Sequence, residues 1–181
     1  MFHAHVISYA DDFVILSRGH AEEALTWTRA VMTKLGLTLN EAKTSVKNAR
    51  REGFDFLGYT LGPRHLPNGG RWYLGASPSK KSMQRVKVKI GELLVPGNKG
   101  AWDEVRARLN RVLRGWSAYF SYGALASAYE AVDQHVYDRT RYFLRQRHKV
   151  QGHGADQFSR EHVYGELAVR CLRRERSRSS P

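Results

Sequence analysis

The apolar residues of this sequence change their spacing near residue 76, and this change constrains the fold more than any other feature. Before it, short β-branched and aromatic runs alternate with turn residues around one helix-spaced stretch, which is typical of antiparallel strands with one helix. After it, apolar residues recur every three or four positions, which predicts helices. We therefore predict an α+β fold. Its expected parts are residues 1–75 (strands with one helix), 76–150 (a small basic helical bundle) and 151–181 (a C-terminal extension ending in a basic disordered tail).

Three apolar stripes predict three helices in the second part. The first helix is expected to begin at Ser77-Pro78, because serine caps helices and proline suits the first turn, and to end at Pro96–Asn98. We expect the helices to pack into a bundle with cations outward and with Trp116, Tyr119 and Phe120 in its core. The stripes are Met83, Val86, Ile90 and Leu93; Trp102, Val105, Leu109, Val112, Trp116 and Phe120; and Tyr129, Val132, Val136 and Phe143.

The first part predicts a hairpin followed by a helix. Two strands over residues 5–9 and 13–17 are joined by the tight polar connection Ala10-Asp11-Asp12. A helix over Leu25–Leu35 follows, and Gly36 stands where a left-handed cap favours glycine. The remaining expectations are a short strand at 37–39, a turn at 40–43, a strand over 54–61, a loop over 63–70 and a returning strand at 72–74.

The charge is concentrated in the second part. Residues 1–75 contain 9 basic and 7 acidic residues, whereas residues 76–181 contain 21 and 10. Clustered cations favour a polyanion such as nucleic acid, because they release counterions from phosphates; a well-solvated surface is the alternative interpretation. No segment reaches the roughly 20 apolar residues of a membrane span, and the single cysteine, Cys171, excludes an internal disulfide. We therefore expect a soluble, intracellular protein with no membrane partner.

The tetrapeptide Tyr9-Ala10-Asp11-Asp12 is the sharpest local feature. Two adjacent carboxylates at a hairpin tip are costly unless they are solvated or bind a cation. Mg²⁺ prefers hard oxygen ligands and is often held by one or two carboxylates together with substrate phosphates. An ordinary aspartate-rich turn is the alternative interpretation.

Four segments in order resemble the reverse transcriptases encoded by bacterial group II introns. The resemblance covers about residues 5–170. It implies that residues 1–75 are the C-terminal part of the polymerase palm and that residues 76–150 are the thumb, or maturase-specific domain X. The segments are Tyr9–Leu16, Gly36–Thr44, Phe54–Tyr59 and Leu109–Gly123.

The resemblance also implies roles for individual residues. RNA-directed DNA synthesis in this family is a two-metal phosphoryl transfer, in which Asp11 and Asp12 match the metal-binding catalytic aspartates and Mg²⁺ is the cofactor. Lys43 matches a catalytic basic residue near the incoming triphosphate, although a lysine in a solvated turn is an equal alternative. Template–primer and group II intron RNA are the implied nucleic-acid partners. The residues expected to bind nucleic acid are Tyr9, Gly58, Lys80, Lys81, Arg85, Arg111 and Arg114.

The sequence also departs from the family pattern. The palm takes a further metal-binding aspartate from a strand well upstream of the hairpin, and only eight residues precede Tyr9. Two aspartates in one turn are too few ligands for two Mg²⁺ ions with substrate. We therefore expect a truncated reverse transcriptase that polymerises only with a complementing N-terminal fragment. Two alternatives stay open: a non-catalytic RNA-binding maturase remnant, and an inactive gene fragment.

Overall fold

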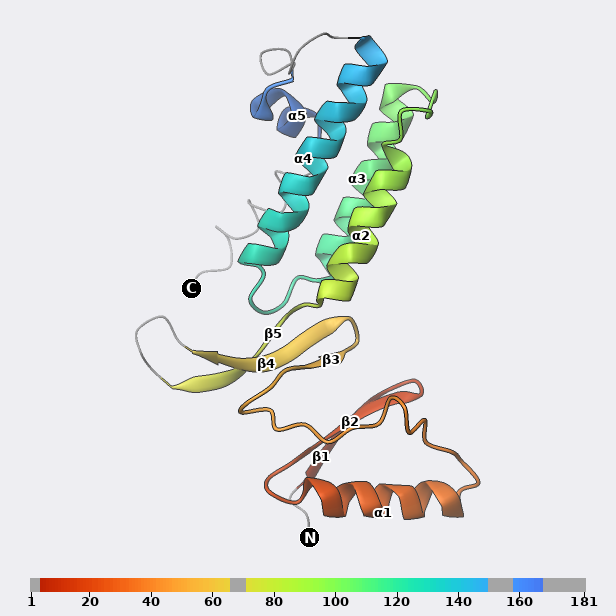
Figure 1. The fold of residues 1–181 in the computed structure, drawn as a ribbon, viewed down its shortest axis with the longest axis vertical. Coiled ribbons are helices and arrows are strands. Elements are labelled where there is room, and N and C mark those ends of the chain that lie inside the picture. The colour runs from red at the N-terminus through yellow and green to blue at the C-terminus, as the bar shows by residue number, and fades with distance from the viewer. Residues whose placement is uncertain (1–3, 66–70, 150–157, 168–181) are drawn as a thin grey trace.

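The computed structural model describes residues 4–65, 71–149 and 158–167. Its elements follow one another along the long axis: a hairpin with one helix at one end, a three-stranded sheet in the middle, and helices at the other end (Figure 1). The predicted α+β fold is confirmed. No helix in the described ranges combines the length and the apolar character that crossing a membrane requires.

The N-terminal hairpin and its helix form where the sequence predicts them. Strands β1 (Ala4–Tyr9) and β2 (Asp12–Ser17) pair antiparallel, with Tyr9 opposite Asp12. Helix α1 (Ala21–Lys34) packs against β2. Gly36, just after the helix, has a φ of +69°, as the expected left-handed cap requires. We call residues 4–53 the hairpin–helix region.

The strand expected at residues 37–39 is absent. These residues pair with no strand in the described part of the chain, and Leu37 is exposed. Three residues without a partner strand cannot satisfy their backbone groups as a sheet does. The turn expected at 40–43 is confirmed, because the N–H groups of Lys43 and Thr44 donate to the carbonyl of Asn40.

A three-stranded antiparallel sheet follows, in the order β3 (Phe54–Phe56), β4 (Tyr59–His65) and β5 (Trp72–Pro78). The single strand expected over 54–61 is wrong, since Leu57 and Gly58 form a tight turn that splits it. The loop expected from Pro63 is also wrong at that residue, which pairs with Leu74 inside the sheet. Phe54, the first residue of β3, pairs with Leu61, so β3 does not reach Pro63. One edge of β4 is therefore free at Pro63, and proline is tolerated at a free edge.

The C-terminal half is helical, with α2 (Lys80–Leu93), α3 (Trp102–Tyr119), α4 (Ala126–His148) and α5 (Arg160–Glu166). Helix α2 begins two residues later than expected, because Ser79 is the N-cap and accepts from the N–H of Ser82 at 3.1 Å, while Pro78 still belongs to β5. The short helix α5 was not predicted. We call residues 80–149 and 158–167 the helical domain.

The core lies in the helical domain, and the predicted apolar stripes supply most of it. Tyr119 is the exception: it is 57% exposed, and its hydroxyl donates to the carbonyl of Leu57 instead of entering the core. Phe158, Val163 and Leu167 are buried and extend the core along α4, because α5 folds back against that helix. The expected disordered tail, residues 173–181, lies outside the described residues.

Candidate functional site

The two aspartates lie at the exposed tip of the β1–β2 hairpin. Ala10 and Asp11 form the turn, and Asp12 is the first residue of β2, opposite Tyr9. Ala10 has a φ of +51°, a left-handed conformation that costs an L-residue about 1–2 kcal/mol. The side chain of Tyr9 is 66% exposed, and both carboxylates are open to solvent.

The carboxylates of Asp11 and Asp12 are chemically suitable ligands for Mg²⁺, but two of them are too few for a centre with two metal ions. Carboxylate oxygen is the ligand that Mg²⁺ prefers. Within the described residues, however, no group of three or more His, Cys, Asp or Glu side chains gathers where it could hold a metal ion. A centre with two Mg²⁺ ions therefore needs ligands beyond Asp11 and Asp12.

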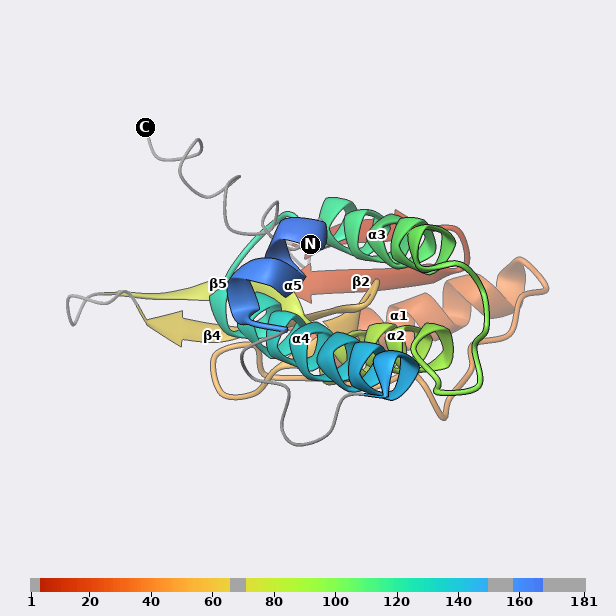
Figure 2. The same cartoon turned by 90° about the horizontal axis from the view of Figure 1, so that it is seen from above.

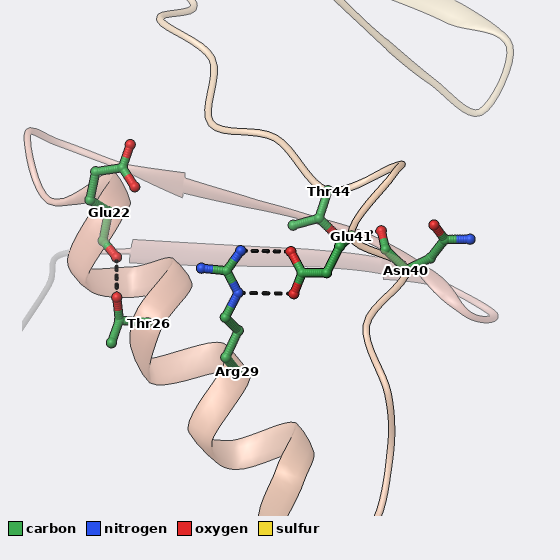
Figure 3. A network of polar contacts seen from close by, with 6 residues as sticks. All are labelled: Glu22, Thr26, Arg29, Asn40, Glu41 and Thr44. Atoms are coloured by element: carbon green, nitrogen blue, oxygen red, sulfur yellow. Dashed lines mark hydrogen bonds and ion pairs between the residues drawn. The ribbon is translucent and has the colours of Figure 1, made fainter.

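Lys43 is exposed on a turn that is tied to α1 by an ion pair (Figure 3). The Arg29 guanidinium donates through Nε to Glu41 Oε1 at 3.0 Å and through Nη2 to Glu41 Oε2 at 2.6 Å. This paired hydrogen bond lowers the pKa of the Glu41 carboxyl and raises the pKa of Arg29. The sequence reasoning missed both partners, because a pair twelve residues apart leaves no local pattern.

The Leu57–Gly58 turn is attached to the helical domain. Both residues have positive φ, +49° and +77°, the pattern of a type I′ hairpin turn. The Gly58 carbonyl accepts from the Ser79 N–H and from the Ser82 hydroxyl, each at 2.9 Å. A Cβ on Gly58 would lie 2.9 Å from Ser82 Oγ and 3.3 Å from the Phe120 ring, so the side-chain position is already filled.

Two tyrosines bond reciprocally across the same junction. The Tyr59 hydroxyl donates to the carbonyl of Tyr119 at 2.8 Å, and the Tyr119 hydroxyl donates to the carbonyl of Leu57 at 2.9 Å. The Tyr59 ring also packs on Phe120, with 4.9 Å between ring centroids, and burial raises the pKa of its hydroxyl. A hydrogen bond from the Ala124 N–H to the Ala76 carbonyl, at 2.7 Å, joins the junction to β5.

The residues of α2 and α3 that were predicted to bind nucleic acid are basic and exposed. Because both the start of α2 and the end of α3 contact Gly58, Lys80, Lys81 and Arg114 lie at the end of the helical domain that adjoins this turn. Arg85 and Arg111 lie one turn further along α2 and α3. All five side chains are exposed, and none has an acidic partner within the described ranges.

The predicted site residues thus fall into two groups. Gly58 and the five cations share the end of the helical domain that adjoins the turn. Tyr9, Asp11, Asp12 and Lys43 belong to the hairpin–helix region, where the chain after α1 runs back along the hairpin (Figures 1 and 3). Sequence reasoning missed Ser82, whose bond to Gly58 leaves no sequence signature.

Taken together, two small antiparallel sheets followed by a helical domain, with exposed cations at one end of that domain, define an α+β protein. Residues 83–164, from within α2 to within α5, match the family described as "Group II intron, maturase-specific domain". Within residues 83–164 the chain is therefore similar to a group II intron maturase-specific domain, which confirms the resemblance expected from the sequence for that part of the chain. A comparison with curated proteins found no match.

Proposed function

We propose that the helical domain binds group II intron RNA and that the start of α2 is a principal phosphate contact. The observation that carries this proposal is the unpaired, exposed cationic end next to the Leu57–Gly58 turn, formed by Lys80, Lys81 and Arg114. The match of residues 83–164 to a maturase-specific domain supports an intron RNA as the polyanion. Splicing of that intron is the process in which such binding acts.

The position of the lysines strengthens the proposal. A helix carries partial positive charge at its N-terminus, so a cation in the first turn costs about 0.3–1 kcal/mol. Helix α2 has no acidic residue in its first turn and begins with Lys80 and Lys81. Two lysines therefore stand where they weaken the fold, and binding to phosphate supplies a reason for their presence.

Salt-dependent RNA binding tests this function. We expect Lys80→Glu/Lys81→Glu to lower the affinity for intron RNA at least tenfold and to reduce the slope of log K against log salt by about two. The matched control is Arg18→Glu/Lys34→Glu, which makes the same charge change at two exposed positions of the hairpin–helix region and should leave the slope nearly unchanged. Equal losses in both variants would show that net charge, and not this surface, determines binding.

A second function follows from the hairpin tip: the palm part of an RNA-directed DNA polymerase. The strained φ of Ala10, between Tyr9 and Asp11, favours it, because backbone strain clusters at functional sites. In this proposal Asp11 and Asp12 would hold Mg²⁺, which supplies charge stabilisation for phosphoryl transfer, and Lys43 would lie near the triphosphate. A separate reverse-transcriptase fragment would supply the missing ligands, the template–primer would be the substrate, and the bacterial cytoplasm the location.

Primer extension tests the polymerase function. The purified chain alone should make no cDNA, because two carboxylates are too few for the centre. Adding an N-terminal reverse-transcriptase fragment should give Mg²⁺-dependent extension that Asp11→Ala abolishes. Asp11→Ala should leave RNA binding by the helical domain intact, which separates this function from the first. If no fragment restores extension while RNA binding persists, the chain is a non-catalytic binding protein.

A further inference from the structure

The β4–β5 hairpin is an arm that projects from the body of the protein. Strand β3 pairs with β4 only as far as Leu61, so residues 62–65 and 72–75 form a two-stranded ribbon. Seen from above, this ribbon extends past the helices (Figure 2). The chain from residue 59 to residue 78 contains no aspartate or glutamate. We call residues 62–65 and 72–75 the ribbon.

One aromatic ring lies beside one arginine on each face of the ribbon. Trp72 and Tyr73 are neighbours in β5, so their side chains point to opposite faces. The Arg50 guanidinium lies over the Trp72 ring, 5.2 Å from its centroid. Tyr73 pairs across the strands with Arg64, whose guanidinium donates through Nη2 to Ser77 Oγ at 2.8 Å.

Gly75 makes room for the pair on the second face. A Cβ at this position would lie 2.4 Å from Arg64 Cγ and 3.2 Å from Tyr73 Cε2, so both side chains pass over the glycine. A methyl group here would therefore displace the arginine. The positions of Arg64 and Tyr73 therefore depend on the absence of a side chain at Gly75.

The rings on the ribbon remain largely open to solvent. Trp72 is 43% exposed and Tyr73 is 44% exposed, although both are large aromatic residues and neither belongs to the core. Trp27 on α1 is also exposed, but it lines a shallow surface pocket together with Glu22 and Glu23. The ribbon differs because its exposed rings have guanidinium groups as neighbours and no acidic residue in the same strands.

This combination fits a ligand with flat, polarisable rings and negative charge. Bases stack on aromatic side chains whatever their identity, and guanidinium groups attract phosphates and stack on the same rings. Bases inside a duplex already stack on both sides, so rings on opposite faces of a narrow arm suit unpaired bases. We propose that the ribbon holds unpaired bases of RNA, with Trp72 and Tyr73 as stacking residues and Arg50 and Arg64 close to phosphates. This inference rests on the proposed RNA-binding function and adds a contact separate from the cations of α2 and α3.

Binding of two RNAs of known structure tests the ribbon. The probes are a 20-nucleotide oligouridine, which is unpaired, and a blunt-ended RNA duplex of similar length. We expect Trp72→Ala and Tyr73→Ala each to weaken oligouridine binding about tenfold and to leave duplex binding nearly unchanged. The salt slope should stay as in the wild type, because no charge is removed. Trp72→Phe should retain most of the affinity.

Trp27→Ala is the matched control, since it also removes an exposed tryptophan, and it should bind both RNAs as the wild type does. Fluorescence gives an independent measurement. Trp102 is partly buried and Trp116 is buried, so Trp27→Phe leaves Trp72 as the most exposed tryptophan, and oligouridine should quench its emission.

The proposal is overturned if Trp72→Ala/Tyr73→Ala binds oligouridine as tightly as the wild type, or loses both RNAs equally. Preferential binding of an acidic peptide over oligouridine would also overturn it and identify a protein partner instead. These results are distinct from failure of the proposed function, in which the wild type would bind neither RNA and Lys80→Glu/Lys81→Glu would change nothing. Circular dichroism of each variant confirms that it is folded.

Discussion

The hairpin–helix region and the helical domain differ in how much of their apolar surface is buried. Among residues 4–53, all of them described, the buried side chains are Ala24 and Thr28. The helical domain instead buries one continuous cluster from α2 to α5. A hairpin with one helix is marginal without further packing, whereas helices around a filled core are stable. We infer that the core of the helical domain is sufficient to stabilise it. The hairpin–helix region needs another protein surface to bury its apolar residues.

The exposed residues of β1 show the same contrast. Val6 is 63% exposed and Ile7 is 49% exposed. In the described structure β1 pairs only with β2, so its other edge is free. Free edges with apolar side chains are sites for strand addition. This agrees with the proposal that a separate reverse-transcriptase fragment completes the palm.

The largest expected effect is a loss of core packing. Leu109→Ala in the fully buried part of α3 should lower the free energy of unfolding by about 3 kcal/mol, because it leaves a cavity. Ile7→Ala in β1 should lower it by less than about 1 kcal/mol, since that side chain is already half exposed. Urea titration followed by circular dichroism at 222 nm measures both. Equal losses would mean that the two regions share one cooperative core.

The next effect concerns the junction between the sheet and the helical domain. Gly58→Ala should lower the free energy of unfolding by about 2 kcal/mol, since φ is +77° and the new Cβ would meet Ser82 Oγ. Gly115→Ala, inside α3 and facing open space, is the control and should raise stability by about 0.5–1 kcal/mol. Thermal denaturation of both variants gives the comparison. An unchanged Gly58→Ala protein would mean that the junction is loose in solution.

A smaller effect of opposite sign is expected for the lysines of α2. Lys80→Glu/Lys81→Glu should raise the free energy of unfolding by about 1 kcal/mol, because acidic residues in the first turn complement the helix dipole. The same variant should lose RNA affinity, so stability and binding move in opposite directions. Chemical denaturation with and without intron RNA measures the two quantities. Loss of both would indicate a structural role for these lysines.

The smallest expected effect is the pH dependence of the Arg29–Glu41 ion pair. The pKa of Glu41 is lowered in the folded chain from its ordinary value of 4.5, so the pair contributes stability above that value and loses it as the pH falls through the lowered pKa. Arg29→Gln should raise the titration midpoint of Glu41, which NMR of its carboxyl carbon measures. The effect on global stability should be small, because both groups are exposed and screened by solvent. A midpoint that Arg29→Gln leaves unchanged would show that the pair does not persist in solution.

The sequence predicted those elements that a periodic apolar pattern specifies. The stripes of α2, α3 and α4 and the alternation around Ala10–Asp11 are such patterns, and each forms as expected. The apolar pattern did not predict the turn at Leu57–Gly58, because apolar residues continue through it from Phe56 to Tyr59 and only the left-handed backbone of Leu57 and Gly58 divides the two strands. The prediction that Tyr119 lies in the core was wrong. Its ring lies outside the core because its hydroxyl donates to the carbonyl of Leu57, and a contact so distant in sequence leaves no local pattern.

The residues of the candidate site also separate into those that the sequence predicted and those that it did not. Asp11, Asp12 and the cations of α2 and α3 were found from the sequence, because their chemistry is visible in residue type and local spacing. The Arg29–Glu41 pair, the bond from Ser82 to Gly58 and the neighbourhood of Arg50 and Trp72 join residues 12, 24 and 22 positions apart along the chain. Contacts of that kind depend on the tertiary fold and leave no trace in a single sequence.

The reciprocal bonds between Tyr59 and Tyr119 have a mechanical consequence. With Ser82 they pin the Leu57–Gly58 turn to α2 and α3, so a swing of the helices carries that turn along as part of one lever. Residues 45–53, at the end of the hairpin–helix region, connect this lever to α1 and the first hairpin without a helix or strand. A tilt of this lever would therefore turn about that connection and would leave the distance between the Leu57–Gly58 turn and the helices unchanged.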